Sequence, residues 1–341
     1  MKLSRRTLLA GAGATAITGL SMTTKAAAPK LGLPKALKPG DKVALIAPAG
    51  ALDDQAHLDK VIEKVKSLGY NPVPMPNVLK RFGYLGGTDK ERADDLNQAL
   101  HDDELRAIFC IRGGYGAMRI LPMLDYAKMH ENPKPIIGYS DITALHLAFY
   151  AKSGVTTFHG PCGESTWGEF SRSTLLVMTE SITFGLCKTL EPLQILVPGK
   201  AKGKIVAGNL SIVVSLLGTP YFPSLKNSIL FLEDIGEDPY RVDRMLTEIL
   251  LSDKAKGLRG LVFGDFRVRL KPGEVATPPD PEKSFTTEQV LFERSQAFKV
   301  PAVSRFPFGH TASNHILPLG VEAELDAEMG TVKILGKAVS S

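Results

Sequence analysis

Short apolar runs that alternate with helical patterns are the feature that most limits how the first half of this chain can fold. The runs over 42–47 (apolar after Lys42), 107–111 and 135–137 are apolar on consecutive residues, which is typical of strands buried on both faces of a sheet. After the first run, apolar residues recur at helical spacing over 58–68, until Gly69 ends the pattern. Strands that alternate with helices predict a mostly parallel sheet flanked by helices.

The second half of the chain follows a less regular pattern. Helical patterns over 210–217 and 242–250 alternate with a strand over 229–232, and residues 321–335 have the pattern of two hairpin strands. We therefore expect a second, mixed α+β domain that is richer in strands. The predicted organisation is a leader over 1–28, a linker over 29–41, an N-terminal α/β domain over 42–165, an inter-domain connection over 166–200 and a C-terminal domain over 201–341.

The predicted leader has the features of an export signal. Arg5 and Arg6 precede a mildly apolar run that extends to Met22, and small residues suited to a signal peptidase follow at 26–28. The arginine pair favours the twin-arginine route and therefore a periplasmic location. A membrane-spanning helix is the alternative, but the run is short and rich in Gly and Thr, and no later run approaches membrane length. We expect no membrane segment after the leader is removed.

Removal of the leader also changes the charge of the chain. The full sequence carries a formal net charge of +5, and residues 1–28 hold four basic residues and no acidic one, so the mature chain falls to +1. No basic stripe with interleaved aromatic residues remains. Nucleic acid is therefore not an expected partner.

The cysteines and the possible metal ligands give no sign of a cofactor. Cys110, Cys162 and Cys187 have neither metal-ligand spacing nor the number expected of a disulfide framework. We expect buried thiols, with one disulfide and one free thiol as the alternative. There is no H-E-x-x-H motif and no other convincing cluster of ligands, so we expect neither a metal nor another cofactor.

Ser140 stands where a buried strand should turn sharply into a helix. The apolar run over 135–137 precedes it, and residues 141–153 are helical in pattern, with Gly154 as the stop. A hydroxyl at such a turn points out of the sheet beside the first amide of the helix, which suits a nucleophile whose oxyanion needs a backbone donor. The motif departs from G-x-S-x-G because Ile142 replaces the second glycine.

A serine nucleophile needs a base, and His310 is the best candidate among the histidines. It follows the end of an expected strand and precedes a polar loop over 311–314. The alternative is a loop histidine bonded to the backbone. Three other histidines, His57, His101 and His130, lie in polar, helical stretches, and we expect them at the surface. His146 lies in the helix after Ser140, where it either faces solvent or packs. The last two are His159 and His315.

Glu233 is the candidate for the acid that orients this base. It follows four apolar residues directly, so it should lie at the carboxyl edge of a buried strand, where binding crevices form in α/β sheets. A carboxylate there is costly unless it is paired. A salt bridge to Arg241 or Arg244 is the alternative, and the neighbouring Asp234 should point to the other side of the strand.

The glycine-rich loop over 112–116 can present backbone amides. It lacks both G-x-G-x-x-G spacing and a G-K-[ST] ending, which argues against a phosphate loop. We interpret it as part of an oxyanion hole, with the amide of Gly114 acting together with the amide of Asp141. An ordinary tight turn is the alternative.

Several short blocks, taken in order, resemble the LD-carboxypeptidase family, the serine peptidases that include muramoyltetrapeptide carboxypeptidases and microcin-immunity proteins. The blocks are Ile111–Gly116, Ile137–Asp141, Gly208–Ser211, Gly218–Tyr221, Leu232–Asp234 and Gly309–His310. The resemblance extends over about residues 42–320, nearly the whole mature chain. Several blocks in the family's order are far more specific than any one of them.

The resemblance implies a Ser–His–Glu triad at Ser140, His310 and Glu233, with oxyanion amides at Gly114 and Asp141. It also implies an active site where the two domains meet, and subunits that pair as homodimers. The implied activity is removal of the terminal D-alanine from murein tetrapeptides through an acyl-enzyme. The export leader favours trimming of peptidoglycan peptides in the periplasm, and it also suits another L,D-peptide or a peptide–nucleotide antibiotic as the substrate.

Two further side chains are expected near the site. A cation should meet the terminal carboxylate of such a substrate, and Arg112 is the candidate. Trp167, in the weakly patterned connection, either lines the site or packs beside it.

Two other classes of protein fit parts of the pattern. An α/β-hydrolase esterase has the same Ser…acid…His order, but the missing second glycine and the absence of an HGGG-type loop argue against it. A non-catalytic periplasmic binding protein would have two α/β domains and an export signal, and Ser140, Glu233 and His310 would then be incidental.

Overall fold

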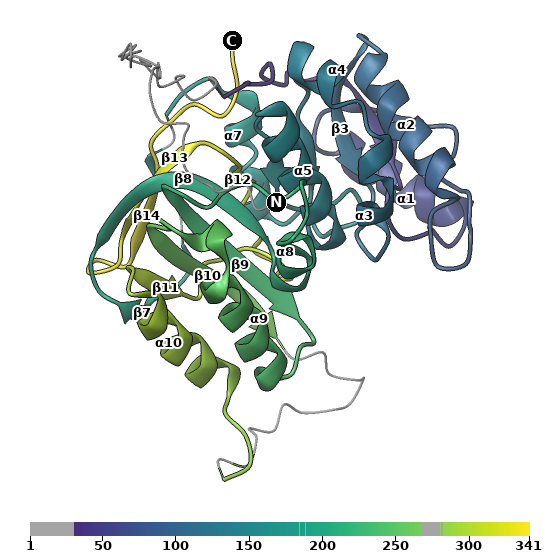
Figure 1. Cartoon of the computed structure of the whole chain (residues 1–341). Helices are drawn as coiled ribbons and strands as arrows, with labels where there is room; N and C mark the ends of the chain where they lie inside the picture. Colours follow the sequence, from purple (N-terminus) through teal and green to yellow (C-terminus); the bar gives the residue numbers. More distant parts are fainter. Residues whose placement is uncertain (1–30, 184, 188, 268–279, 281) are drawn as a thin grey trace, which may run out of the picture. The chain divides into compact units, whose positions relative to one another are not determined.

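A mostly parallel sheet organises the first half of the chain (Figure 1). Its strand order is β12-β5-β4-β3-β1-β2, and β1 to β5 pair in parallel. The strands are β1 (Lys42–Ile46), β2 (Asn71–Pro74), β3 (Leu105–Cys110), β4 (Ile136–Gly138), β5 (Phe158–His159) and β12 (Leu317–Pro318). The last of these comes from the far end of the chain and pairs antiparallel with β5.

The computed structural model describes residues 31–183, 185–187, 189–267, 280 and 282–341. Residues 31–341 cluster as one unit, so both sheets belong to the same body. The expected leader over 1–28 and the first two residues of the expected linker lie outside the described residues. None of the described helices is both long and apolar enough to cross a bilayer.

Helices connect the strands of the first sheet, and their ends carry clear start signals. Asp54 caps α1 by accepting a hydrogen bond from the amide of His57, and Thr88 and Glu91 form a capping box at the start of α2. The helices of this half are α1 (Gln55–Lys66), α2 (Asp89–His101), α3 (Ala117–Ile120), α4 (Tyr126–Glu131) and α5 (Thr143–Ser153), with short 3₁₀ turns η1 (Leu121–Met123) and η2 (Ser140–Ile142).

The second sheet is mixed, as expected for the second half. Its order is β6-β14-β13-β8-β9-β10-β11-β7, with β8 to β11 parallel and the β13–β14 hairpin and β7 antiparallel to their neighbours. The strands are β6 (Gly185–Leu186), β7 (Gln194–Val197), β8 (Lys200–Asn209), β9 (Ser228–Ile235), β10 (Gly260–Arg267), β11 (Ala302–Ser304), β13 (Glu322–Asp326) and β14 (Thr331–Ile334). The expected hairpin over 321–335 is confirmed.

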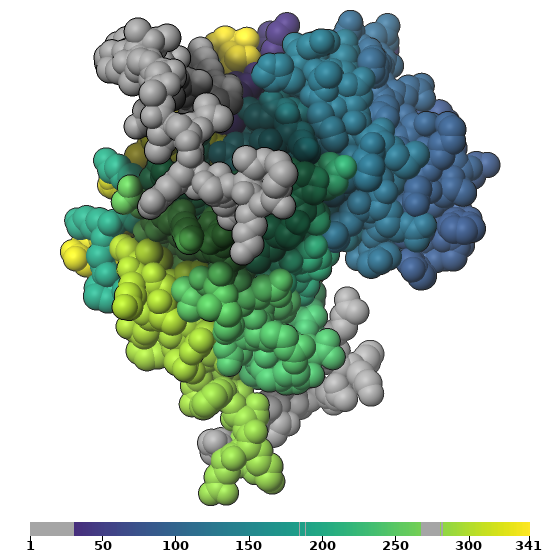
Figure 2. Space-filling view, viewed as in Figure 1, coloured from purple at the N-terminus to yellow at the C-terminus, as the bar shows by residue number. Residues whose placement is uncertain are grey.

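Helices α9 and α10 lie side by side next to the strands of this sheet (Figure 1). The helices of the second half are α6 (Glu169–Ser173), α7 (Leu176–Thr179), α8 (Leu210–Leu216), α9 (Pro239–Leu251) and α10 (Thr287–Phe298), with the 3₁₀ turn η3 (Asp253–Ala255). Figure 2 shows the residues of the first half gathered on one side, in blue, and those of the second half on the other, in green and yellow.

Two elements of the first sheet differ from the sequence-based expectation. Strand β2 was missed in the sequence. It contains Pro72 and Pro74, which are tolerated because β2 lies at the edge of the sheet. Residues 155–158 have the β-branched and aromatic pattern of a short strand, but the strand that forms is shorter. Val155 forms only an isolated bridge with Gly32, and the regular pairing begins at Phe158.

Helix α5 is buried and packs against both the first sheet and β8. Residues Thr143–Phe149 are all buried. A methyl group on Gly208, in β8, would lie 2.3 Å from Cγ2 of Thr143, so only glycine allows this approach. The backbone amide of Asn209 then donates a 2.9 Å hydrogen bond to Oγ1 of Thr143. The helix after Ser140 is thereby tied to the second sheet.

We expect Gly208→Ala to lower the free energy of unfolding by about 1–3 kcal/mol, because the new methyl group overpacks a dry contact. Gly218→Ala is the matched control, since a methyl group at Gly218 meets no atom within 4 Å and should change stability by less than about 0.5 kcal/mol. Urea unfolding of both variants measures the difference. Equal costs at the two positions would contradict the close contact.

Candidate active site

Ser140 lies at the sharp turn between β4 and α5, as the sequence predicts. Its φ angle is +63°, in the left-handed region that residues with a side chain rarely adopt. For a residue other than glycine this conformation costs about 1–2 kcal/mol, and such strain gathers at functional sites. The surrounding structure therefore holds the Ser140 backbone in an unfavourable conformation that aims its side chain away from the sheet.

The packing around Gly138 explains why this turn has only one glycine. A methyl group on Gly138 would lie 2.9 Å from Cγ2 of Ile142 and 3.1 Å from Cβ of Cys110. Ile142 therefore occupies the space beside the first glycine, and the turn closes without a second one. This turn therefore has the strand–turn–helix geometry of the G-x-S-x-G motif, but the side chain of Ile142 packs where the motif has its second glycine.

Glu233 and His310 form a direct pair. Nδ1 of His310 lies 2.7 Å from Oε2 of Glu233, and the Glu233 side chain is fully buried in β9. Gly309 has a φ angle of +96°, and a methyl group there would lie 2.5 Å from Cγ of Glu233, so glycine lets the loop reach the carboxylate. The expected juxtaposition of these two residues is confirmed by this distance.

The alternative of a salt bridge from Glu233 to a nearby arginine is wrong. Arg241 lies beside Glu237 and Asp238, and the Arg244 guanidinium lies over the ring of Tyr240 at 5.3 Å. Both arginines belong to the exposed side of α9, whereas Glu233 faces the loop of His310.

Burial raises the pKa of Glu233, and the hydrogen bond from His310 opposes this shift. Desolvation disfavours the carboxylate, so the ionised form depends on the imidazole beside it. The same carboxylate fixes which ring nitrogen of His310 carries the proton. The other nitrogen is then able to accept a proton.

A cavity of about 580 Å³ brings the other predicted site residues together. Its wall includes Ser140, His310, Arg112, Gly114 and Asp141. Glu233 reaches this cavity through His310. Residues from the first sheet and from the second sheet therefore line one space.

The glycine-rich loop passes very close to the serine. A methyl group on Gly113 would lie 2.8 Å from Cβ of Ser140, and Gly114 has a φ angle of +119°, with its Cβ position 3.2 Å from Cα of Gly50. Both positions therefore require glycine. An ordinary tight turn would not place two glycines against Ser140 and Gly50, so the close approach favours a role in the site.

The Asp141 side chain is occupied away from the cavity. It is buried and accepts a 2.7 Å hydrogen bond from the amide of Ala117, at the start of α3. Burial raises the pKa of this carboxyl group, and the hydrogen bond from Ala117 opposes the shift. Any contribution of Asp141 to chemistry in the cavity therefore comes from its backbone.

Arg112 lines the cavity with its guanidinium partly fixed. Its Nη1 donates a 2.9 Å hydrogen bond to the carbonyl of Ala51, and its Nε lies 3.6 Å from Oε1 of Glu164. Glu164 also contacts His57 at 3.0 Å. The positively charged guanidinium of Arg112 is therefore held on the side of the cavity that residues of the first sheet form.

A polar network in the wall of the cavity was missed in the sequence. Nδ2 of Asn209 donates to Oδ1 of Asp234 at 3.0 Å, and Oγ of Ser211 donates to Oδ2 of the same carboxylate at 2.6 Å. Asp234 thus lines the cavity on the side of β9 away from Glu233, as the strand alternation predicts. The Gly208–Ser211 block was the signal that could have revealed this network.

Two histidines lie buried beneath the turn of Ser140. Nε2 of His146 lies 2.8 Å from the carbonyl of Gly138, and burial lowers the pKa of His146 to about 4. His159 is also buried, 6.1 Å away between ring centres, and burial lowers its pKa well below the usual value. His146 therefore packs rather than facing solvent. Both rings are neutral parts of the core near neutral pH.

The remaining candidates have structural roles or lie at the surface. His101 and His130 are exposed, and His57 is half-buried. His315 is buried, and burial lowers its pKa to about 4. Trp167 packs, with its indole nitrogen donating to the carbonyl of Cys162 at 3.1 Å, and it does not line the cavity.

All three cysteines are buried free thiols, so the alternative of a disulfide is wrong. Burial raises the pKa of Cys162 and of Cys187 to about 12 and shifts Cys110 in the same direction, which makes the thiols unreactive. Over the described residues, no group of three or more His, Cys, Asp or Glu side chains could hold a metal ion.

Two family models match the chain in sequence order. Residues 43–160 match the LD-carboxypeptidase N-terminal domain, and residues 202–325 match the LD-carboxypeptidase C-terminal domain. Together the two matches include most strands of both sheets and every residue discussed above as a candidate for catalysis.

Individual relatives agree with the family models. A probable murein peptide carboxypeptidase of Bacillus subtilis is 36% identical, over 88% of this chain and 93% of the relative. The microcin C7 self-immunity protein of Escherichia coli is 27% identical, over 82% of this chain and 88% of its own length. The crystal structure of a muramoyltetrapeptide carboxypeptidase from Oxalobacter formigenes superposes with a TM-score of 0.75 at 29% identity, covering 88% of this chain and 100% of that one.

The strain at Ser140 predicts an unusual order of stability among its variants. Ser140→Gly should be more stable than Ser140→Ala by about 1 kcal/mol, because glycine adopts a positive φ angle without a penalty. Ser215, which is exposed in α8, is the matched control, and there glycine should be less stable than alanine by about 1 kcal/mol. Urea unfolding of the four variants gives the two differences, and differences of the same sign would contradict the strain.

Proposed function

The chain belongs to the LD-carboxypeptidase family and is a serine-type carboxypeptidase, and we propose that it releases the terminal D-alanine from murein tetrapeptides. The family membership argues against both the α/β-hydrolase esterase and the non-catalytic binding protein. The substrate rests on the names of the relatives, which include a murein peptide carboxypeptidase and a muramoyltetrapeptide carboxypeptidase.

One observation carries the proposed mechanism. The fully buried carboxylate of Glu233 holds Nδ1 of His310 at 2.7 Å, and His310 lines the same cavity as the strained Ser140. A carboxylate that fixes an imidazole beside a serine is the arrangement that activates a hydroxyl for attack. The proposal therefore assigns Ser140 as the nucleophile, His310 as the base and Glu233 as the orienting acid.

The reaction proceeds in two halves. His310 takes the proton of Ser140 as Oγ attacks the carbonyl carbon of the L-configured residue, and the amide C–N bond then breaks as His310 passes that proton to the leaving amine of D-alanine. Water next attacks the acyl-enzyme ester as His310 takes a proton from it. The ester bond to Oγ of Ser140 then breaks, and His310 returns the proton to Oγ. Glu233 stabilises the imidazolium in both halves.

The negative charge that develops on the carbonyl oxygen needs donors. We assign this role to the backbone amides of Gly114 and Asp141, because both residues line the cavity and Gly113 brings the loop against Ser140. Each donor can lower the barrier by about 3–4 kcal/mol. Because Asp141 uses its side chain to hold Ala117, its backbone is fixed before substrate binds.

The terminal carboxylate of the substrate needs a cation, and we assign Arg112. Its guanidinium lines the cavity on the side of the first sheet and is held by the carbonyl of Ala51. The ion pair with Glu164 is long, at 3.6 Å, so the guanidinium keeps donors for a ligand.

A second substrate class has support from one relative. The similarity to a microcin self-immunity protein favours hydrolysis of a peptide–nucleotide antibiotic or of another L,D-peptide by the same residues. Incubation with a peptidyl nucleotide and with the tetrapeptide, at equal concentrations, separates the two classes by which one is cleaved.

We expect the purified protein to release D-alanine from L-Ala-γ-D-Glu-meso-diaminopimelate-D-Ala. Glu233→Gln should lower kcat by roughly 10²–10⁴-fold with little change in KM, because the amide leaves His310 without an ionic partner. Glu237→Gln, which changes a carboxylate outside the cavity near the same strand, is the matched control and should leave kcat within about twofold. If the unaltered protein releases no D-alanine from this tetrapeptide, the assigned substrate is wrong.

We also propose export through the twin-arginine route. The support is the Arg5–Arg6 pair followed by the apolar run and the small residues at 26–28. In a bacterial host, the unaltered protein should be found in the periplasm, shortened near residue 28. Changing Arg5 and Arg6 to Lys should retain the full-length chain in the cytoplasm, whereas Lys2→Gln should not. Identical fractionation of all three forms would count against this route.

We further propose that the mature subunits pair as homodimers. The support is the family resemblance alone, and sedimentation of the purified protein over a range of concentrations tests it.

A further inference from the structure

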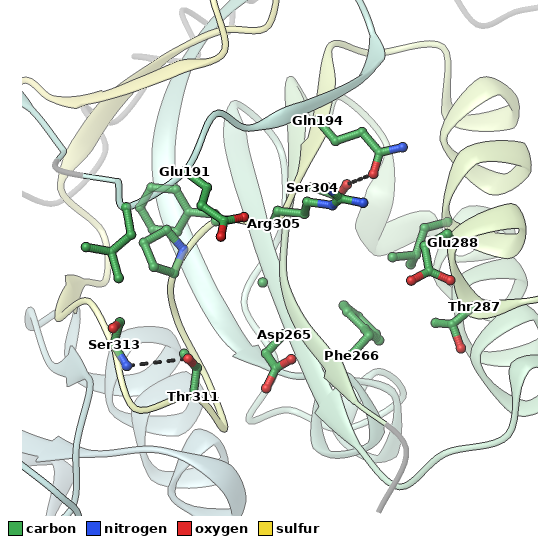
Figure 3. Close-up of a pocket in the computed structure, with 15 residues that line it drawn as sticks. Glu191, Gln194, Asp265, Phe266, Thr287, Glu288, Ser304, Arg305, Thr311 and Ser313 are labelled. Carbon is green, nitrogen blue, oxygen red and sulfur yellow. Dashed lines mark hydrogen bonds between the residues drawn. The ribbon is translucent and has the colours of Figure 1, made fainter. Parts of the chain in front are cut away.

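A second cavity lies at the carboxyl edge of the second sheet (Figure 3). Its volume is about 450 Å³, and it is lined by the ends of β10 and β11, the first turn of α10, the segment before β7 and the loop after His310. None of the residues to which the proposed mechanism assigns a role lines it.

The loop after His310 forms a wall common to both cavities. His310 lines the active-site cavity, and the next residue, Thr311, lines the second one. The amide of Asp265 donates to the carbonyl of Phe308 at 3.2 Å, and Phe266 pairs in the sheet with Asp234, which lines the active-site cavity. The two cavities therefore lie next to each other at the carboxyl ends of β9 and β10, on either side of the loop that carries His310 and Thr311.

Charged side chains of both signs surround the second cavity. Figure 3 shows Arg305 together with Glu191, Asp265 and Glu288 around this space. Within the part of the chain that the structure describes, no hydrogen bond or ion pair engages the guanidinium of Arg305, or the carboxylates of Glu191 and Glu288. These three charged residues therefore line one cavity, and no salt bridge is formed among them.

The backbone of Arg305 is strained, with a φ angle of +66°. Among the described residues other than glycine, positive φ angles occur at Ser140, Asn227, Lys299 and Arg305. Asn tolerates this conformation, and Lys299 is the left-handed cap that ends α10. Ser140 is the proposed nucleophile. Arg305 is then the remaining position of this group, and neither its residue type, nor a helix end, nor the proposed mechanism explains its strained backbone. Strain of this kind points to a functional position.

We propose that the second cavity is a subsite for a zwitterionic side chain of the substrate, with its carboxylate on Arg305 and its ammonium among Glu191, Asp265 and Glu288. This proposal rests on the proposed function, because the residue that Ser140 would attack in the tetrapeptide is diaminopimelate. Its side chain ends in an ammonium and a carboxylate. A guanidinium binds a carboxylate with two parallel hydrogen bonds, and carboxylates accept from an ammonium.

The two arginines would then bind carboxylates on opposite sides of the scissile bond. Arg112, on the side of the first sheet, meets the carboxylate of the leaving D-amino acid. Arg305, on the side of the second sheet, meets the distal carboxylate of the residue that acylates Ser140. Selection for diaminopimelate over lysine at this position would follow, since lysine has the ammonium but lacks the distal carboxylate.

Two tetrapeptides that differ only at the third residue, meso-diaminopimelate or L-lysine, test this subsite. Arg305→Gln should lower kcat/KM for the diaminopimelate peptide by about 10–100-fold and leave the lysine peptide within about twofold, because only the first peptide loses a charged hydrogen bond. Replacing both Glu191 and Glu288 with Gln should lower kcat/KM for both peptides by roughly tenfold. Arg259→Gln, an exposed arginine that does not line the cavity, should affect neither peptide.

A binding measurement makes the subsite testable apart from turnover. Calorimetry with Ser140→Ala should show tighter binding of the diaminopimelate peptide, and the preference should disappear when Arg305→Gln is added. Equal losses for both peptides in Arg305→Gln, or no change in either, would overturn the subsite. If the unaltered protein releases D-alanine from neither peptide, the proposed function fails instead, and the calorimetric preference alone then decides the subsite.

Discussion

The contact between the start of α5 and the carboxyl end of β8 is the constraint on which the site depends. Gly208 lets β8 approach Thr143, and the amide of Asn209 bonds to the hydroxyl of Thr143. Asn209 also bonds to Asp234, the neighbour of Glu233 in β9. The turn that carries Ser140 and the strand that carries Glu233 are thus held by one short chain of contacts. A movement of either sheet would change the position of the serine relative to His310.

The site also concentrates features that do not favour folding. Ser140 has a strained backbone, and Glu233 is a fully buried carboxylate. Each is tolerated because its surroundings fix it: the packing of Ile142 on Gly138 holds the turn, and His310 partners the carboxylate. Such a site is pre-organised, since little has to move when charge develops in the transition state. We expect these features to lower the free energy of unfolding while they keep the geometry of the site fixed.

The buried strands, the strand–serine–helix turn and the pairing of Glu233 with His310 were predictable from the sequence. Apolar runs and periodicity report burial and secondary structure, and the blocks of the family resemblance report the order of the site residues. The sequence could not predict that Ile142 fills the space of a second glycine, because that depends on contacts across the turn. The network of Asn209, Ser211 and Asp234 and the edge strand β2 also depend on tertiary packing, which overrides local propensity.

The central claim is that Ser140 is the nucleophile and that His310, held by Glu233, activates it. Intact-mass spectrometry after treatment with a fluorophosphonate, followed by peptide mapping, tests this claim directly. We expect one adduct, on Ser140, that is absent in Ser140→Ala and forms far more slowly in His310→Gln. An adduct on another residue, or equal labelling of the unaltered protein and Ser140→Ala, would contradict it.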